Sequence, residues 1–197
     1  MLRCVVVQYP VCMRANLILF QLWRNENVEI ETIQKLRYGF DCRMGKGQKC
    51  FLKWGGNHFG DYPINAEIID DEYNKNNGAC TEPDNFYPWT AIDDDNRAVG
   101  HFIMRYTGGN SRQLHFGWVI VDDTLRGKGY GKQMLTLGLE YAFDILKVDR
   151  VTIGVFENNE PAYLCYKKVG FVETEIVQDE PWNVVEMEIV RNKYYEK

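Results

Sequence analysis

The chain has 197 residues, which is long enough for one well-buried domain and too short for two ordinary ones. Hydrophobic residues make up 45% and charged residues 26%, a balance typical of a soluble globular protein rather than a disordered one. The formal net charge of −5 and the lack of a long basic run argue against a nucleic-acid partner.

The six cysteines contain no Cys-x-x-Cys pair, and only three histidines accompany them. We therefore expect no metal site, and reduced thiols in a cytoplasmic protein. No apolar stretch approaches the roughly 20 residues that span a bilayer, so we expect no membrane partner. The apolar run from Ala15 to Trp23 is short, and no small-residue cleavage site follows it. We therefore interpret it as part of the core of an intracellular protein and not as a signal peptide.

The first 62 residues carry the weakest pattern. Cys4 to Gln8 predicts a strand, whereas Leu17 to Trp23 fits either a strand or a helix. We interpret Tyr38 to Gly60 as a loop lying over the domain. A helix is predicted from Pro63 to Asn74, because a proline in the first turn is followed by acidic residues. An exposed connection should then reach Pro83.

The pattern is clearer from residue 86 onward. Three strands joined by two turns predict an antiparallel meander, at Phe86 to Ile92, Ala98 to Tyr106 and Leu114 to Val121. Apolar residues recur at helical spacing from Gly129 to Lys147, which indicates an amphipathic helix. The remaining elements are a strand around Val151 to Val155, a short helix from Pro161 to Val169 that ends at Gly170, and two strands, Phe171 to Val177 and Val184 to Val190.

The stretch from Val121 to Gly131 joins the third strand to the long helix through a glycine-rich loop. The first N–H groups of a helix have no partner within it, and they carry the positive end of its dipole. Glycines let an anion approach the backbone without a clashing Cβ. Arg126 and Lys128 add positive charge, so the loop suits a pyrophosphate, although glycines also serve loop geometry alone.

Two familiar phosphate-binding patterns do not match this loop. A Walker loop requires Ser or Thr after its Gly-Lys, and Gln133 stands there instead. A dinucleotide fingerprint spaces its last two glycines three residues apart, whereas glycines here alternate from 127 to 131. The preceding strands also form hairpins rather than parallel βαβ units.

The loop and a second motif together resemble a known family. The letters R-G-K-G-Y-G at 126–131 resemble the Arg/Gln-x-x-Gly-x-Gly/Ala signature of the GCN5-related N-acetyltransferase superfamily. The letters N-E-P-A at 159–162, followed by Tyr166 and closed by G-F at 170–171, resemble its second hallmark. The resemblance covers roughly residues 86–190, includes the order of the elements, and has no counterpart upstream of about Pro63.

The resemblance implies a single α/β domain over residues 1–197, with an acetyl-CoA-binding core at 86–190. Its sheet should be mixed and mostly antiparallel, flanked by helices. The strand before the loop and the Val151 strand should run parallel and splay apart, so that pantetheine enters between them. The implied reaction is direct transfer of acetyl from acetyl-CoA to a primary amine of a small molecule or protein, in a ternary complex.

Two alternatives to this activity stay open. One is a non-catalytic acyl-CoA-binding or sensing module of the same fold, and the other is an interaction protein whose glycine loop is purely structural. Dimerisation is common among such proteins, so the resemblance is compatible with a homodimer.

The resemblance also implies which positions bind the cofactor. The loop amides would hold the pyrophosphate, the preceding strand would bond the pantetheine and the acetyl carbonyl, and the second motif would contact the pantetheine arm or an ordered water. These positions are Val119, Val121, Arg126, Gly127, Lys128, Gly129, Tyr130, Gly131 and Asn159.

Two residues are implied for proton transfer. Tyr166 would be the general acid for the leaving thiolate, whose unperturbed pKa is only about 1.5 units below that of tyrosine; the alternatives are a packing role and, as a weaker competitor, Tyr163. His115 occupies the position where many relatives carry a carboxylate base, and its ordinary pKa suits proton uptake near neutrality. The alternative is a hydrogen-bonded strand histidine. We expect Cys165 to pack rather than to act as a nucleophile.

Aromatic residues before and within the meander offer a candidate lining for an acceptor cleft, although core packing is the commoner role for such side chains. They are Trp54, Phe86, Tyr87, Trp89 and Trp118.

Overall fold

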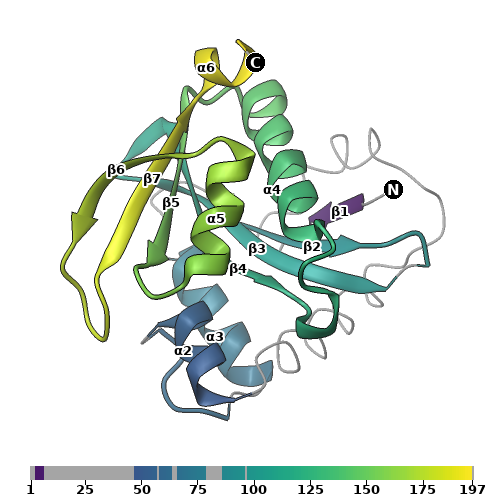
Figure 1. Ribbon diagram of the computed structural model, residues 1–197, viewed down its shortest axis with the longest axis vertical. Coiled ribbons are helices and arrows are strands. Elements are labelled where there is room, and N and C mark those ends of the chain that lie inside the picture. The colour runs from purple at the N-terminus through teal and green to yellow at the C-terminus, as the bar shows by residue number, and fades with distance from the viewer. Residues whose placement is uncertain are drawn as a thin grey trace.

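A computed structural model describes residues 3–6, 47–56, 58–63, 66–78, 86–95 and 97–196. These residues build a seven-stranded sheet in the order β1-β2-β3-β4-β5-β7-β6 (Figure 1). The strands are β1 (Arg3–Val6), β2 (Phe86–Ile92), β3 (Ala98–Thr107), β4 (Asn110–Val121), β5 (Arg150–Phe156), β6 (Val172–Val177) and β7 (Val184–Val190). The helical segments are α2 (Gln48–Gly55), α3 (Ala66–Gly78), the 3-10 turn η3 (Asp123–Leu125), α4 (Tyr130–Glu140), the π-helical η4 (Tyr141–Ile145), α5 (Glu160–Val169) and α6 (Arg191–Tyr195).

Neighbouring strands of this sheet run antiparallel except for β4 and β5. Their parallel pairing extends from Gln113 opposite Arg150 to Phe116 opposite Ile153. Beyond these pairs β4 continues to Val121 and β5 to Phe156 without pairing to each other. The predicted mixed, mostly antiparallel fold with a splayed parallel pair is therefore confirmed.

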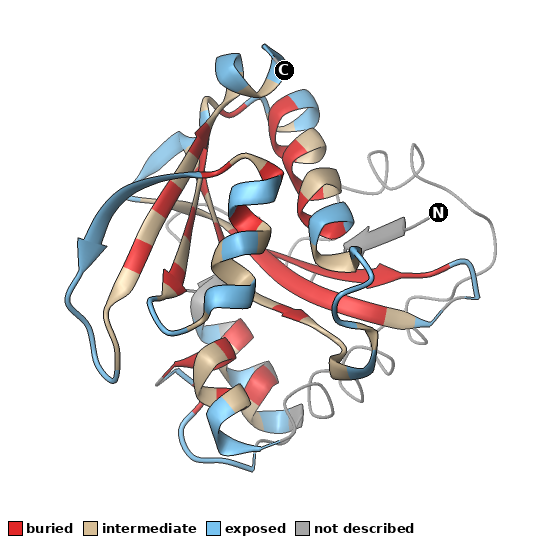
Figure 2. Cartoon of the chain, in the orientation of Figure 1, coloured by how far each residue is buried: buried red, intermediate tan, exposed pale blue. Residues whose placement is uncertain are grey.

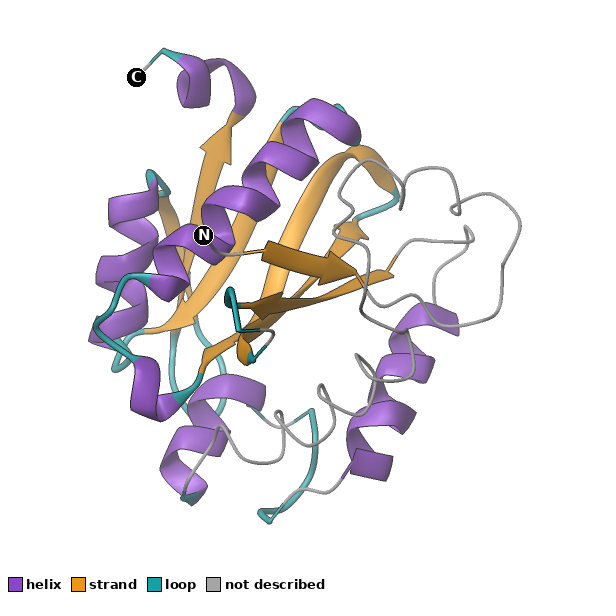
Figure 3. Cartoon of the chain, turned by 90° about the vertical axis from the view of Figure 1, so that its right-hand side faces the viewer, coloured by secondary structure: helices purple, strands orange, loops and turns teal. Residues whose placement is uncertain are grey.

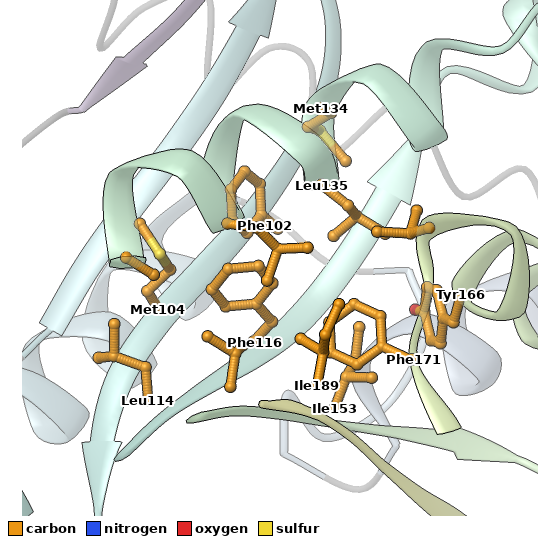
Figure 4. Packing of buried hydrophobic residues seen from close by; sticks show 14 of the residues in the cluster. Phe102, Met104, Leu114, Phe116, Met134, Leu135, Ile153, Tyr166, Phe171 and Ile189 are labelled. Atoms are coloured by element: carbon orange, nitrogen blue, oxygen red, sulfur yellow. The ribbon is translucent and has the colours of Figure 1, made fainter. Parts of the chain in front are cut away.

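Helices cover both faces of the sheet (Figures 1 and 3). Because side chains alternate along a strand, Phe102 and Met104 of β3 point to one face and Ile103 to the other. The first core lies under α4 and α5 and includes Phe102, Phe116, Leu135, Ile153, Tyr166 and Phe171 (Figure 4). The second core lies under α2 and α3 and includes Phe51, Trp54, Phe59, Ile69, Tyr73 and Ile103.

Burial follows this layered arrangement. Every residue of β2 is buried, whereas every residue of the edge strand β6 is exposed (Figure 2). Helix α4 packs closely on the sheet at Gly138, where an added Cβ would lie 2.7 Å from Cζ of Phe102. The small residue therefore sets the height of α4 above the first core.

The strands and helices predicted after residue 86 are present, with ends shifted by a few residues. The predicted long helix is α4 continued by η4, and Lys147 ends it with a φ of +57°. The strand expected from Cys4 is β1, observed from Arg3 to Val6.

Expectations for the N-terminal part are less accurate. The loop predicted from Tyr38 to Gly60 is wrong over Gln48–Gly55, which forms α2. Helix α3 begins at Ala66 and extends to Gly78, into the expected connection. The run from Leu17 to Trp23 lies outside the described residues.

Candidate functional site

A glycine loop links β4 to α4. Asp122 starts it: its Oδ1 accepts hydrogen bonds from the Thr124 backbone N–H (2.8 Å) and from the Thr124 hydroxyl (2.6 Å). Gly127 and Gly129 then have φ values of +79° and +86°, in the left-handed region that favours glycine. Gly129 is the N-cap of α4 and has no side chain to accept from the first-turn N–H groups. The loop thus presents the positive end of α4 without a covering side chain.

Strand β4 carries a bulge just before this loop. Gly117 lies opposite Ile103 and Ile120 opposite His101, so two residues of β4 face one residue of β3. Trp118, within the bulge, has a φ of +46°. The bulge reverses the alternation of side chains, so that Val119 and Val121 pack against the first core while Trp118 and Ile120 belong to the second.

A cavity of about 550 Å³ opens where β4 and β5 diverge. Its walls come from the end of β4, the glycine loop, the first turn of α4, helix α5 and helix α2. The predicted site residues that line it are Val119, Val121, Arg126, Gly127, Gly129, Tyr130, Gly131, Asn159 and Tyr166. The two motifs, separated by about 30 residues of chain, therefore meet at one cavity. Lys128 and His115 are not among the lining residues.

The charge around the cavity differs from that of the whole chain. Its lining includes the cations Lys53, Arg126, Lys132 and Lys168, and no Asp or Glu among the described residues. The guanidinium of Arg126 is held beside the loop: its Nε donates to the Val121 carbonyl at 3.2 Å. Although the chain has a net charge of −5, the cavity itself is cationic and suits an anionic ligand.

Asn159 is the N-cap of α5. Its carbonyl accepts hydrogen bonds from the N–H groups of Ala162 and Tyr163, both at 3.1 Å. Its side chain makes no capping hydrogen bond to the helix and lines the cavity. Asn159 therefore brings the start of the second motif to the cavity wall.

Tyr166 belongs both to the first core and to the cavity wall. Its ring lies 6.2 Å from the ring of Phe171, and only 5% of the residue is exposed (Figure 4). Burial raises the pKa of Tyr166 above its usual value, so the hydroxyl stays protonated at neutral pH. The hydroxyl therefore keeps a proton that it could donate, but the raised pKa makes it a weaker acid than an exposed tyrosine. The burial of the ring fits the packing role as well.

His115 lies on the other face of β4, before the bulge. It pairs across the sheet with Arg105 on β3 and Thr152 on β5, and its Nδ1 is 3.0 Å from the Thr152 hydroxyl. Burial, together with the charge of Arg105, lowers the pKa of His115 to about 4. The imidazole is therefore neutral at pH 7, but it is a weak base and is not among the residues that line the cavity.

Helix α2 contributes cavity residues that neither sequence motif includes. Cys50, Lys53 and Trp54 all line the cavity. The sequence feature that could have indicated this helix is the three-residue spacing of Phe51 and Trp54, which puts both on one side of a helix. Of the aromatic residues suggested for an acceptor cleft, Trp54 lines the cavity, Tyr87 and Trp89 lie in the first core, and Phe86 and Trp118 lie in the second.

Two absences hold for the residues that the structure describes. No group of three or more His, Cys, Asp or Glu side chains there is arranged to hold a metal ion. None of the helices described is both long enough and apolar enough to cross a membrane.

The chain is similar to several acetyltransferases. It is 35% identical over 51 residues to a spermine/spermidine N(1)-acetyltransferase of Bacillus subtilis (strain 168), covering 26% of this chain and 34% of that protein. It is 30% identical over 76 residues to an N-acetyltransferase 9-like protein of Nematostella vectensis, covering 39% of this chain and 37% of that protein. The chain thus spans only about a third of the length of these curated relatives.

Solved structures share the fold. The spermidine N-acetyltransferase from Vibrio cholerae in complex with CoA and spermine matches with a TM-score of 0.65 and 20% identity, over 86% of this chain and 96% of that one. The model of the acetyltransferase (GNAT) family matches residues 54–171, which is more than half of the chain and includes both motifs. The chain therefore belongs to the acetyltransferase (GNAT) family.

Proposed function

We propose that this chain is an acetyl-CoA-dependent N-acetyltransferase that moves an acetyl group directly to a primary amine. One observation carries the proposal: the glycine loop and the Asn159–Tyr166 segment line the same cavity at the point where β4 and β5 diverge. The family membership supports the same reaction class.

The residues present fit coenzyme A. An added Cβ at Gly127 would meet no atom within 4 Å, so the loop leaves open space in front of its backbone. The loop amides, with Arg126 and Lys128, would hold the pyrophosphate, and Lys132 and Lys168 add cations near it. The rest of the cavity wall is largely apolar and would contact the pantetheine arm through Val119, Val121 and the Asn159 amide. The ring of Tyr130 would contact the same arm.

Acetyl-CoA, when bound, supplies an activated thioester. The chain would contribute a main-chain donor, the Val119 N–H, to polarise the acetyl carbonyl. The Tyr166 hydroxyl would donate its proton to the leaving thiolate, and its raised pKa keeps that proton in place beforehand. His115 is proposed as proton acceptor through water; with a pKa of about 4 it is weak, so we expect the amine to arrive neutral and the loss of His115 to have a modest effect.

Polyamines are the first acceptors to assay. A relative in sequence is named as a spermine/spermidine N(1)-acetyltransferase, and a solved structure of the same fold holds spermine. The other members of the panel should be a lysine-containing peptide, a peptide with a free N-terminus and an aminoglycoside.

Binding and turnover should be measured separately. Isothermal titration should show micromolar affinity for acetyl-CoA, and Arg126→Glu should weaken it by at least about ten-fold, because one charge-assisted contact is worth about 1.5–3 kcal/mol. A thiol-release assay across the amine panel should then identify an acceptor. Absence of acetyl-CoA binding by the wild type would overturn the proposal.

Tyr166→Phe tests the catalytic part. We expect unchanged acetyl-CoA affinity and a kcat lower by about 10²-fold, the lower end of the usual contribution of a positioned acid. Tyr163→Phe is the matched control, because that hydroxyl donates to Glu173 outside the cavity lining. If acetyl-CoA binds, no amine is acetylated and Tyr166→Phe changes nothing, the non-catalytic binding module is the correct function.

A further inference from the structure

Helix α2 bridges the two strands that diverge at the cavity. The indole Nε1 of Trp54 donates a hydrogen bond to the Trp118 carbonyl of β4 at 2.7 Å. The adjacent Lys53 donates through Nζ to the carbonyl of Asn158, in the loop that follows β5. Two consecutive residues of one short helix thus hydrogen-bond to β4 and to the loop after β5. Figure 1 shows where α2 lies relative to these segments.

The carbonyl that Trp54 contacts belongs to the β4 bulge. Trp118 has a φ of +46°, a conformation that costs a non-glycine residue about 1–2 kcal/mol. The Trp118 ring is held by stacking on Tyr73, with centroids 5.0 Å apart and planes at 7°, and by Phe59 at 4.9 Å. Aromatic packing therefore fixes the side chain of the bulge, and the Trp54 hydrogen bond fixes its backbone.

The same peptide unit carries the N–H of Val119. A trans peptide is planar, so its C=O and its N–H point in opposite directions. Fixing the Trp118 carbonyl on the Trp54 indole therefore also fixes the direction of the Val119 N–H. Val119 lines the cavity, in the part of β4 beyond the last pair with β5, Phe116 opposite Ile153.

We propose that Trp54 is a positioning residue that aims and polarises the Val119 N–H toward the acetyl carbonyl. This inference rests on the proposed function, in which that N–H stabilises the charge developing on the carbonyl oxygen. A hydrogen bond accepted by the carbonyl end of a peptide strengthens donation by its N–H end, and the effect is larger in a water-excluded site. Trp54 itself does not touch the reacting atoms in this proposal.

Trp54→Phe removes the donor and keeps an aromatic ring to stack on Phe59, which lies 4.8 Å away at an angle of 3°. Because CoA lacks the acetyl carbonyl, its affinity should stay within about two-fold of the wild type. Acetyl-CoA affinity should fall by several-fold and kcat by about ten-fold, as expected for weakening rather than deleting a donor to the oxyanion. In infrared difference spectra of bound [1-¹³C]acetyl-CoA, the carbonyl band should move to higher wavenumber.

Phe59→Leu is the matched control. It disturbs the packing of both Trp54 and Trp118 without deleting a hydrogen-bond donor. We expect its Tm to fall at least as far as that of Trp54→Phe, with the ratio of acetyl-CoA to CoA affinity and the carbonyl band both unchanged. If Trp54→Phe fails to fold, 3-benzothienylalanine introduced at position 54 removes the N–H and preserves the ring shape.

The outcomes separate this inference from the function on which it rests. A wild type that binds CoA and acetyl-CoA with no turnover, or binds neither, overturns the proposed function and this role of Trp54 with it. An active wild type whose Trp54→Phe variant loses affinity for both ligands equally, or keeps its carbonyl band in place, overturns only the role of Trp54.

Discussion

Replacing Gly129 by alanine separates the binding role of the loop from its structural role. Gly129 has φ +86° and ψ −1°, so an alanine there costs about 1–2 kcal/mol of backbone strain, partly offset by about 0.4–1 kcal/mol from a less flexible unfolded chain. The nearest atom to the added Cβ is Nε2 of Gln133 at 3.7 Å, an ordinary contact, so no clash adds to the strain. The net loss of about 1 kcal/mol should lower Tm by about 2–4 °C for a chain of this size.

The expected effect on binding is larger. The new methyl group would occupy the approach to the N–H groups at the start of α4, where the pyrophosphate is proposed to lie. Losing one charge-assisted hydrogen bond costs about 1.5–3 kcal/mol, which corresponds to roughly 10- to 150-fold weaker affinity. Isothermal titration with CoA, alongside thermal melts, measures both quantities on the same sample.

Gly108→Ala provides the control. Gly108 lies in the turn between β3 and β4, has a φ of +65°, and an added Cβ there would meet no atom within 4 Å. It should show a similar loss of Tm with unchanged CoA affinity. The reasoning is refuted if Gly129→Ala binds CoA as tightly as the wild type, or if both variants weaken binding equally.

Three further predictions concern stability and are measured by urea unfolding. Gly138→Ala should lower the free energy of unfolding by about 1–2 kcal/mol despite the better helix propensity of alanine, because its Cβ would lie 2.7 Å from Phe102; an increase would show that the ring moves aside freely. The pKa of His115 is about 4 in the folded state and about 6.5 in the unfolded state, so the unfolded state takes up the proton first as the pH falls. The free energy of unfolding should therefore fall by about 2 kcal/mol from pH 7 to pH 5, and His115→Gln should reduce this fall. Asp93→Ala should cost about 2 kcal/mol, since the buried carboxylate accepts from the Asp95 N–H and from both the N–H and the guanidinium of Arg97; a neutral result would make this turn dispensable.

The parts of the fold that the sequence predicted are those specified by local pattern. The strands of the meander alternate, α4 has a continuous apolar side, and Gly170 ends α5 with a φ of +120°. Each of these signals acts over a few neighbouring residues, so it can be recognised without knowledge of the rest of the chain. The order of the elements then allowed the family resemblance to supply the topology and the candidate cofactor residues.

Helix α2 could not be predicted in this way. It has eight residues, glycines on both flanks and no side-chain cap, so its local sequence provides little helical stability. Packing of Phe51 and Trp54 in the second core, and hydrogen bonds to segments 64 and 105 residues away, hold it instead. Its contribution to the cavity is therefore a tertiary property.

What the sequence by itself determined is the glycine loop, the amphipathic helix after it and the second motif, because glycine conformation and side-chain periodicity are local. The tertiary structure decided where these parts meet. The bulge at Trp118 turns Val119 and Val121 toward the first core, on the face opposite to His115, and no local pattern predicts a tryptophan with a positive φ. The tertiary structure also brings several cationic side chains to one cavity of an acidic chain. The local charge of a site depends on which segments distant in sequence are brought together there.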